Sequence, residues 1–322
     1  MKIILIDNPD SGDDSRPSCE QILRLIRDAG HKVNYQSSKA KKWKKALKKR
    51  CDIVAIAGGD GTVGKVARCL IGSRTPIAVL PTGKANNVAN MLGLTERPLE
   101  DLIKGWKTAH CVNFDAGVAK GPWGSQCFIE GFGIGLFAET MSQLDGRKIL
   151  DLTHSDDPKK VIRAVLNILK NQLRNYPSKN MTVRLDGRDV SGDYVLLEAL
   201  NIRYIGPNLD LVPRADINDG FLDVVFVTKA QRAKLSKYLS DRISGKNSRV
   251  SLTVRRGRHL QIELKNSPIH IDDTAWPKGK DRTPLRSNAI DIKIDPGALV
   301  FLTPVEKRRR RLPRVNARSS PS

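Results

Sequence analysis

The chain has 322 residues, 39% of them hydrophobic, and a formal net charge of +22. This length suits two domains with packed cores, while no apolar run approaches the ~18 residues that a membrane span needs. The five cysteines form no CxxC pair, which argues against a disulfide framework or a structural zinc site and favours a reduced, cytoplasmic protein. The opening residues, Met1–Asp7, are too short for a signal peptide and are typical of a first strand.

The positive charge is concentrated in two segments. Residues 39–50 hold eight basic residues and no acidic one, and residues 307–322 hold seven basic residues and no acidic one. Such local charge predicts contact with a polyanionic surface, either anionic lipid or nucleic acid. The alternative is a solvated basic helix and a disordered tail, which would need no partner.

The first third of the chain alternates short apolar runs with helical patterns. The runs that predict buried parallel strands are Ile3–Ile6, Val33–Tyr35, Ile53–Ala57 and Pro76–Leu80. Helices are predicted between Ser18, as the N-cap, and Gly30, over Lys39–Lys49, after Thr62 and from Val88. This alternation predicts an α/β, doubly wound domain over residues 1–108.

Alternating segments begin near Ala109 and predict an antiparallel β domain over residues 109–297. Its expected strands are Val112–Val118, Gln126–Ile129, Met181–Leu185, Tyr194–Leu200, Leu222–Val227, Leu252–Val254, Leu260–Leu264, Ile269–Ile271 and Ile290–Ile294. Asp186-Gly187 predicts a hairpin turn, and Pro158–Leu173 and Ala230–Leu239 predict helices. A closing strand at 298–306 is expected to pack back on the first domain, before a disordered basic tail at 307–322.

Polar loops follow three of the predicted parallel strands. Gly58-Gly-Asp-Gly-Thr62 lies between a strand and a helix, where free backbone N–H groups and the helix dipole favour a phosphate. The loops at Asn8, Gly58 and Thr82 should converge at the carboxyl ends of the strands, and Lys84 could place a charge on a phosphate there. For any single loop, the alternative is a tight turn that binds nothing.

Six short motifs follow one another along the chain. They are Asn8-Pro-Asp-Ser-Gly12, Gly58-Gly-Asp-Gly-Thr62, Pro81-Thr-Gly-Lys-Ala-Asn-Asn87, Gly131-Phe-Gly-Ile-Gly135, Pro213-Arg-Ala-Asp-Ile-Asn-Asp-Gly-Phe-Leu-Asp223 and His270-Ile-Asp-Asp-Thr274. In this order the chain resembles the diacylglycerol kinase catalytic-domain family, which includes bacterial lipid kinases and sphingosine kinases. Each motif is weak alone, but together they cover most of the chain.

The resemblance implies an NAD kinase/diacylglycerol kinase-like nucleotide domain, a β-sandwich-like second domain and a cleft between them. It also implies ATP and Mg²⁺ as cofactors and a lipid hydroxyl as the phosphate acceptor. The ATP-binding residues that it implies are Asn8, Ser37, Gly58, Gly59, Asp60, Gly61, Thr62, Gly83, Lys84 and Asn86. Asp60 would act through the metal ion or its waters, because Mg²⁺ prefers hard oxygen ligands.

The resemblance further implies a catalytic base and a second metal ion. Bacterial members hold a structural Mg²⁺ at positions that match Asp216, Asp219 and the backbone carbonyl of Phe221. Their base is a glutamate at the position of Thr274, and a threonine cannot accept a proton at neutral pH. Asp272 is therefore the predicted base, with Asp273 as the second candidate.

The predicted function is an ATP- and Mg²⁺-dependent lipid kinase that docks on a membrane through the basic segments 39–50 and 307–318. One alternative is a catalytically weak or inactive nucleotide- or lipid-binding relative, since Thr274 and Lys84 depart from the family, which usually has threonine at position 84. A second alternative is a kinase that phosphorylates a soluble substrate such as NAD. Nucleic-acid binding ranks last because aromatic residues make up only 5% of the chain and no stacking motif is present. The sequence names neither the lipid nor the oligomeric state.

Overall fold

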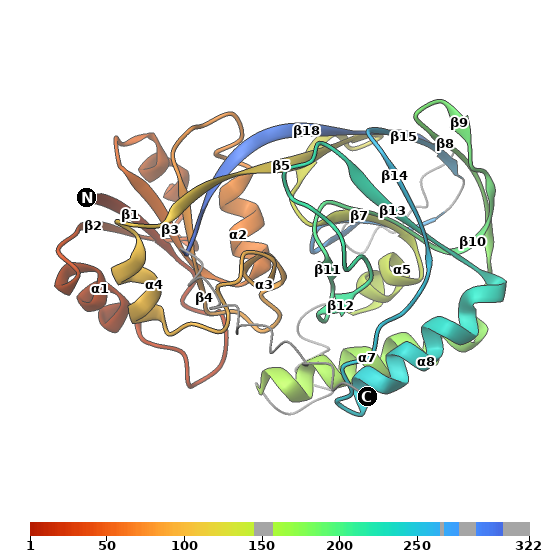
Figure 1. The fold of residues 1–322 in the computed structure, drawn as a ribbon, viewed down its shortest axis with the longest axis horizontal. Coiled ribbons are helices and arrows are strands. Elements are labelled where there is room, and N and C mark those ends of the chain that lie inside the picture. Colours follow the sequence, from red (N-terminus) through yellow and green to blue (C-terminus); the bar gives the residue numbers. More distant parts are fainter. Residues whose placement is uncertain (145–156, 265–266, 277–287, 305–322) are drawn as a thin grey trace, which may run out of the picture.

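The computed structural model describes residues 1–144, 157–264, 267–276 and 288–304. The molecule has two lobes, and two long strands, β5 (His110–Gly121) and β18 (Asn288–Thr303), run from one lobe to the other (Figure 1). None of the described helices is long and apolar enough to cross a membrane.

The first lobe is built on a parallel sheet with the order β4-β3-β1-β2. Its strands are β1 (Lys2–Asp7), β2 (Lys32–Ser37), β3 (Ile53–Gly58) and β4 (Ile77–Pro81), and its helices are α1 (Cys19–Asp28), α2 (Asp60–Ala67), α3 (Asn87–Met91) and α4 (Leu99–Gly105). β3 is buried along its whole length because helices lie on both sides of the sheet (Figure 1). The predicted α/β domain is confirmed.

The helix predicted over Lys39–Lys49 is wrong in kind and in length. The segment forms only a 3-10 helix, η1 (Trp43–Lys48), in which Trp43 is the one buried residue. Trp43 and the partly buried Ala46 and Leu47 bury too little apolar surface to stabilise three turns of α-helix. The basic residues around Trp43 from Lys41 to Arg50 are exposed.

The second lobe is an antiparallel β-sandwich with helices against one of its faces, which confirms the predicted class. Its strands are β6 (Gly124–Phe128), β7 (Gly131–Gly135), β8 (Lys179–Leu185), β9 (Arg188–Asp189), β10 (Gly192–Leu200), β11 (Tyr204–Ile205), β12 (Leu209–Asp210), β13 (Leu222–Thr228), β14 (Thr253–Gly257), β15 (His259–Leu264), β16 (Ile269–Ile271) and β17 (Thr274–Trp276). Its helices are α5 (Leu136–Gln143), α7 (Pro158–Asn175), η2 (Lys229–Gln231) and α8 (Arg232–Ile243). The turn predicted at Asp186-Gly187 joins β8 to β9, and both of its residues have positive φ.

Two separate cores lie on the two faces of β13. Leu222, Val224 and Phe226 pack into the core between the sheets, whereas Val225 and Val227 pack with α5, α7 and α8. This alternation follows the two-residue period of a strand. The helices therefore form a layer of their own on the outer face of the sheet, and this layer carries one wall of the site described below.

The strands predicted separately at Ile290–Ile294 and at 298–306 form one strand, β18, whose pairing with β5 shifts register between Asp295 and Leu299. Beyond the shift, Phe301 pairs with Ile77 of β4, so the end of β18 extends the parallel sheet of the first lobe. The tail predicted at 307–322 lies outside the described residues.

Asp115 of β5 holds the joint between the lobes. It is fully buried, and its two carboxylate oxygens accept hydrogen bonds from the backbone N–H groups of Gly220 and Gly297, each at 2.7 Å. Gly297 lies in the register shift of β18, and Gly220 lies in the turn before β13. Burial raises the pKa of Asp115, and the two amide bonds oppose this shift.

Replacing Asp115 with asparagine should therefore destabilise the joint. The amide NH2 group would face a backbone N–H donor and leave it unpaired, at a cost of about 2–3 kcal/mol in the free energy of unfolding. Urea denaturation of Asp115→Asn against the wild type measures this loss. The exposed Asp28→Asn is the matched control, and equal stability of both variants would contradict the anchoring role.

Candidate functional site

Loops that follow the four parallel strands gather at one edge of the sheet and line a cavity of about 420 Å³, here called the loop cavity. Its walls come from residues after β1, β2, β3 and β4, with one residue from the second lobe. They are Asn8, Asp10, Ser11, Gly12, Ser38, Lys39, Gly59, Gly61, Thr62, Lys65, Gly83, Lys84 and Asp273. The convergence predicted for the Asn8, Gly58 and Thr82 loops is confirmed, since the strands are parallel and end at the same edge.

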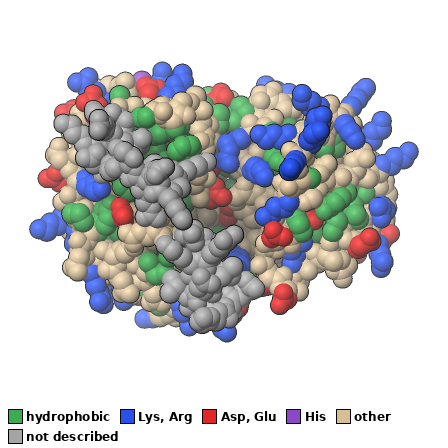
Figure 2. Space-filling view, turned by 180° about the vertical axis from the view of Figure 1, so that it is seen from behind, with side chains coloured by type: hydrophobic (Ala, Val, Ile, Leu, Met, Phe, Trp, Pro, Cys, Tyr) green, Lys and Arg blue, Asp and Glu red, His purple; other side chains and the backbone are tan. Residues whose placement is uncertain are grey.

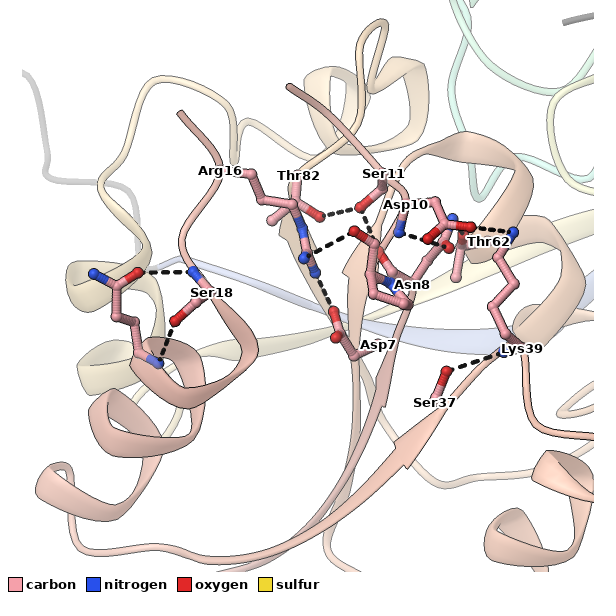
Figure 3. A network of polar contacts seen from close by, with 12 residues as sticks. Asp7, Asn8, Asp10, Ser11, Arg16, Ser18, Ser37, Lys39, Thr62 and Thr82 are labelled. Carbon is pink, nitrogen blue, oxygen red and sulfur yellow. Dashed lines mark hydrogen bonds and ion pairs between the residues drawn. The ribbon is translucent and has the colours of Figure 1, made fainter. Parts of the chain in front are cut away.

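Hydrogen bonds between the loops fix the shape of the loop cavity (Figure 3). Asn8 donates its Nδ2 proton to Thr62 Oγ1 at 3.1 Å, and the hydroxyls of Ser11 and Thr82 are 2.9 Å apart. Behind them, Arg16 forms an ion pair with Asp7, the buried last residue of β1. The three loops therefore support one another before any ligand is present.

Two glycines allow the close approaches that the cavity requires. A Cβ atom at Gly83 would lie 2.2 Å from the Gly59 Cα, and one at Gly61 would lie 2.3 Å from Asp273 Oδ2. A side chain at Gly83 would push the two loops apart, and one at Gly61 would displace the carboxylate of Asp273. The backbone of the glycine loop is thus left open toward the cavity, as an anion site at a helix N-terminus needs.

Six of the predicted ATP-binding residues line the loop cavity: Asn8, Gly59, Gly61, Thr62, Gly83 and Lys84. Four do not. Gly58 ends β3, Ser37 ends β2 with Ser38 in the wall instead, and Asp60 points into the neighbouring cavity. Asn86, in the left-handed region with φ of 55°, pins the loop by bonding both backbone polar groups of Gly83, at 3.0 and 2.8 Å.

Sequence reasoning missed Lys65, the third lysine in the wall of the loop cavity. Lys65 of α2 reaches the cavity with its ammonium group 5.1 Å from the Trp43 ring centre and 3.1 Å from the Ser38 carbonyl oxygen. Its position four residues after Gly61 places it one helical turn further along α2, which was the available signal. With Lys39 and Lys84, three lysines surround the cavity and favour a polyphosphate.

A second cavity of about 350 Å³, here called the apolar cavity, adjoins the first and is lined by residues of both lobes. Its walls are mainly apolar side chains of α5 and α7 and of the β11–β12 loop, namely Phe137, Met141, Leu144, Val161, Ile162, Val165, Leu169, Ile205 and Pro207. Its other end is polar, with Asp60, Asn87, Glu130, His270, Asp272 and Asp273. Lys84 and Asp273 line both cavities, so the two meet at these side chains.

The polar end brings four acidic side chains together, Asp60, Glu130, Asp272 and Asp273. Burial raises the pKa of Asp60, and burial together with the neighbouring carboxylates raises the pKa of Glu130 well above its usual range. Asn87 donates to Glu130 Oε2 at 3.1 Å. Burial lowers the pKa of His270, but its contact with Glu198 at 2.8 Å outweighs this and raises it. Some acidic side chains are visible in the hollow between the lobes, and Lys and Arg side chains are numerous over the first lobe (Figure 2).

Both carboxylate oxygens of Asp272, the predicted base, are bonded to other groups of the protein. Its Oδ1 accepts from the backbone N–H groups of Ile129, Glu130 and Gly131 at 3.1, 2.8 and 3.3 Å, and its Oδ2 pairs with Arg68 at 2.6 Å. Its backbone adopts a left-handed conformation with φ of 49°. Both oxygens are thus engaged, and the geometry favours Asp273, which projects past this turn to Gly61 and receives a 3.2 Å hydrogen bond from Thr274.

The predicted metal set does not fit a divalent cation. Asp219 Oδ1 accepts from the Phe221 N–H at 3.0 Å and its Oδ2 pairs with Arg256, while Asp216 Oδ1 accepts from the Asn218 N–H at 3.1 Å. Among the described residues, no group of three or more His, Cys, Asp or Glu side chains has the arrangement of a metal site.

Comparison with known proteins gives two family matches, one after the other along the chain. Residues 2–118 match the diacylglycerol kinase catalytic domain, and residues 158–303 match the YegS C-terminal NAD kinase beta sandwich-like domain. The chain is 26% identical to the diacylglycerol kinase of Bacillus subtilis over 261 residues, which cover 76% of this chain and 79% of that protein. It is 25% identical to a protein of Stenotrophomonas maltophilia named probable lipid kinase YegS-like, and the aligned residues cover 83% of this chain and 84% of that protein.

Solved structures show the same fold. A crystal structure of a putative diacylglycerol kinase from Bacillus anthracis matches with a TM-score of 0.69 at 19% identity, over 94% of this chain and 97% of that one. The yeast NADH kinase complexed with NADH matches with a TM-score of 0.53 at 9% identity, over 95% and 84%. With both domain types matched in order and with the predicted two-domain fold present, the chain belongs to the diacylglycerol kinase catalytic-domain family.

Proposed function

We propose that the protein is an ATP-dependent lipid kinase, which transfers the γ-phosphate of a nucleotide in the loop cavity to the hydroxyl of a lipid in the apolar cavity. The observation that carries this proposal is that Lys84 and Asp273 line both cavities. A phosphate donor and a hydroxyl acceptor would therefore meet at one point, and positioning is the main requirement of phosphoryl transfer. The names of the relatives in B. subtilis and S. maltophilia indicate the same class of reaction.

The loop cavity supplies what a triphosphate needs. Backbone N–H groups at Gly59–Gly61 lie at the N-terminus of α2, and Lys39, Lys65 and Lys84 surround them. Main-chain amides and ammonium groups both stabilise phosphate oxygens, and they keep this role as negative charge shifts during transfer. Lys84 lies where the two cavities meet, so its ammonium group is the one placed to follow the transferred phosphate.

Asp273 is the proposed general base. It reaches the meeting point of the two cavities, where it would accept the proton of the lipid hydroxyl as the oxygen attacks phosphorus. The 3.2 Å hydrogen bond from Thr274 to its Oδ1 orients the carboxylate. Asp273, which precedes the position where the family has glutamate, would thus act as the general base in this chain.

A divalent cation bound together with a nucleotide needs few protein ligands, because phosphate and water oxygens supply the others. The polar end offers Asp60 for this task, and burial raises the pKa of Asp60, so that a nearby cation would favour its charged form. Asp60 would hold Mg²⁺, directly or through water, together with the nucleotide phosphates. The ion would neutralise charge on the transferring phosphate.

The apolar cavity and its rim suit an acceptor that stays in a bilayer. Lys159, Lys160 and Arg163 of α7 are exposed and alternate with Val161 and Ile162, which line the cavity. The basic residues 41–50 of the first lobe are also exposed, and Lys or Arg near an anionic surface contributes ~1 kcal/mol each. We propose that these groups dock the mouth of the cavity on an anionic membrane; residues 307–318 lie outside the described part of the chain.

The test is a phosphorylation assay with labelled ATP. Anionic phospholipid vesicles would carry diacylglycerol, monoacylglycerol, ceramide or sphingosine in turn, and NAD without vesicles would be a separate acceptor. Labelled lipid that requires both Mg²⁺ and vesicles is the expected result. Labelled NAD with no labelled lipid would instead favour a soluble acceptor, the alternative that the fold of the yeast NADH kinase keeps open. No label in any acceptor would indicate a non-catalytic relative.

Asp273→Asn should remove the proton acceptor and lower kcat by about 10²–10⁴-fold, with the KM for ATP changed little. Initial rates at saturating lipid measure this. Asp193→Asn, exposed on β10 and outside both cavities, is the control and should match the wild type. A fully active Asp273→Asn variant would remove Asp273 from the proposed mechanism.

Val165→Trp should fill part of the apolar cavity and raise the KM for the lipid by at least about tenfold, because ~0.8 kcal/mol of burial is lost for each excluded CH2 group. The KM for ATP should stay constant. Asn167→Trp places the same side chain on the exposed side of α7 and should leave both constants unchanged. Equal lipid KM values for the two variants would show that the cavity does not hold the lipid.

Activity should also depend on the charge of Asp272. Burial raises its pKa to about 6, and Arg68 opposes the rise. Since only the ionised carboxylate pairs with Arg68, kcat should fall about tenfold per pH unit below that value. Arg68→Met removes the opposing charge, so the acid limb of the pH–rate profile should move to higher pH. The exposed Arg74→Met is the control and should leave the pH–rate profile unchanged. If the acid limb of the profile does not move in Arg68→Met either, a group other than Asp272 causes that limb.

A further inference from the structure

The turn that precedes β13 gathers acidic side chains at the joint between the lobes. Asp216 and Asp219 lie in the turn, and Asp223 is the second residue of β13. Asp115 lies beneath them, bonded to the N–H of Gly220 at 2.7 Å. The conformation of this turn therefore decides whether the N–H of Gly220 can reach the carboxylate of Asp115.

A guanidinium group lies among these carboxylates. Arg256 on β14 is the direct cross-strand partner of Asp223, because β13 and β14 pair in antiparallel register. Its side chain forms an ion pair with Asp219 Oδ2, and its Nε is 3.6 Å from Asp223 Oδ1. The guanidinium carbon also lies 4.7 Å from the centre of the Phe221 ring.

Arg256 leaves little of the carboxylate set for another cation. It occupies one oxygen of Asp219, and the N–H of Phe221 occupies the other at 3.0 Å. One oxygen of Asp216 is also bonded within the turn, by the N–H of Asn218 at 3.1 Å. A divalent ion needs several oxygens directed at one point, and here they are directed at amides and at the guanidinium.

We propose that Arg256 supplies from within the chain the positive charge that stabilises the turn at residues 216–223, so that this turn forms without a divalent cation. A guanidinium suits this role because it is permanently charged, planar and able to bind two carboxylates at once while it stacks on an aromatic ring. The resemblance to bacterial lipid kinases implied a structural Mg²⁺ at this turn; in this chain the ion is replaced by a side chain. The inference does not depend on the proposed kinase activity.

The test is the thermal unfolding midpoint of the nucleotide-free protein, in EDTA and in millimolar Mg²⁺ or Ca²⁺. Wild type and Asp219→Asn should respond to the added metal ion by the same amount, because in the proposal Asp219 pairs with Arg256 and binds no metal ion. Arg256→Ala should unfold earlier in EDTA and regain at least about 3 °C with the cation, which then takes the vacated place. This gain should disappear in the double variant Arg256→Ala/Asp219→Asn.

Arg255→Ala is the matched control, since Arg255 is the exposed neighbour on β14 and forms no part of the turn. It should respond to the cations as the wild type does. A wild-type gain that Asp219→Asn abolishes would overturn the proposal, because a metal ion would then bind the turn beside Arg256. An Arg256→Ala variant that gains no more than the wild type would overturn it too. If Arg256→Ala does not fold, the comparison of wild type with Asp219→Asn decides by itself.

Discussion

The site depends on one buried carboxylate. Asp272 accepts hydrogen bonds from three successive backbone N–H groups at the start of β7 and pairs with Arg68, which follows the last residue of α2. These bonds connect the second lobe to the helix that begins at the glycine loop. They also hold Asp272 in a left-handed conformation, and this turns the next side chain, Asp273, toward Gly61. A carboxylate is well suited here, because it can accept several charge-assisted bonds at once.

A second buried carboxylate accepts backbone hydrogen bonds at the joint between the lobes. Asp115 bonds two backbone N–H groups from segments distant in sequence, the turn at Gly220 and the register shift at Gly297. A buried carboxylate with both oxygens satisfied fixes the relative position of these segments, although its desolvation is costly. The two lobes therefore share two strands and two buried carboxylates, and the cavities on either side of Asp273 keep a fixed relation.

Residues that differ from those usual in the family lie at the proposed point of phosphoryl transfer. Lys84 stands where the family usually has threonine, and Thr274, next to Asp273, stands where it has glutamate. In the proposed mechanism Lys84 and Asp273 act together, since they line both cavities and bring one positive and one negative group to the point of transfer. At the turn before β13, Arg256 likewise places a protein charge where the family resemblance implied a metal ion. In both proposals a charged side chain of this protein acts at a position where it differs from the family or where the family resemblance implied a metal ion.

The sequence by itself determined the parallel sheet, the antiparallel second lobe and the convergence of Asn8, Gly59, Thr62 and Gly83, because apolar periodicity and glycine loops are local patterns. It did not determine that the basic segment after Ser38 forms only a 3-10 helix. Nor could it show that Asp272 is engaged while Asp273 faces the cavities, or that Arg256 pairs with Asp219. These facts depend on contacts between residues far apart in the chain, 204 positions for Arg68 and Asp272 and 37 for Asp219 and Arg256. Only the folded chain brings such partners together, and their charges then decide the role of each side chain.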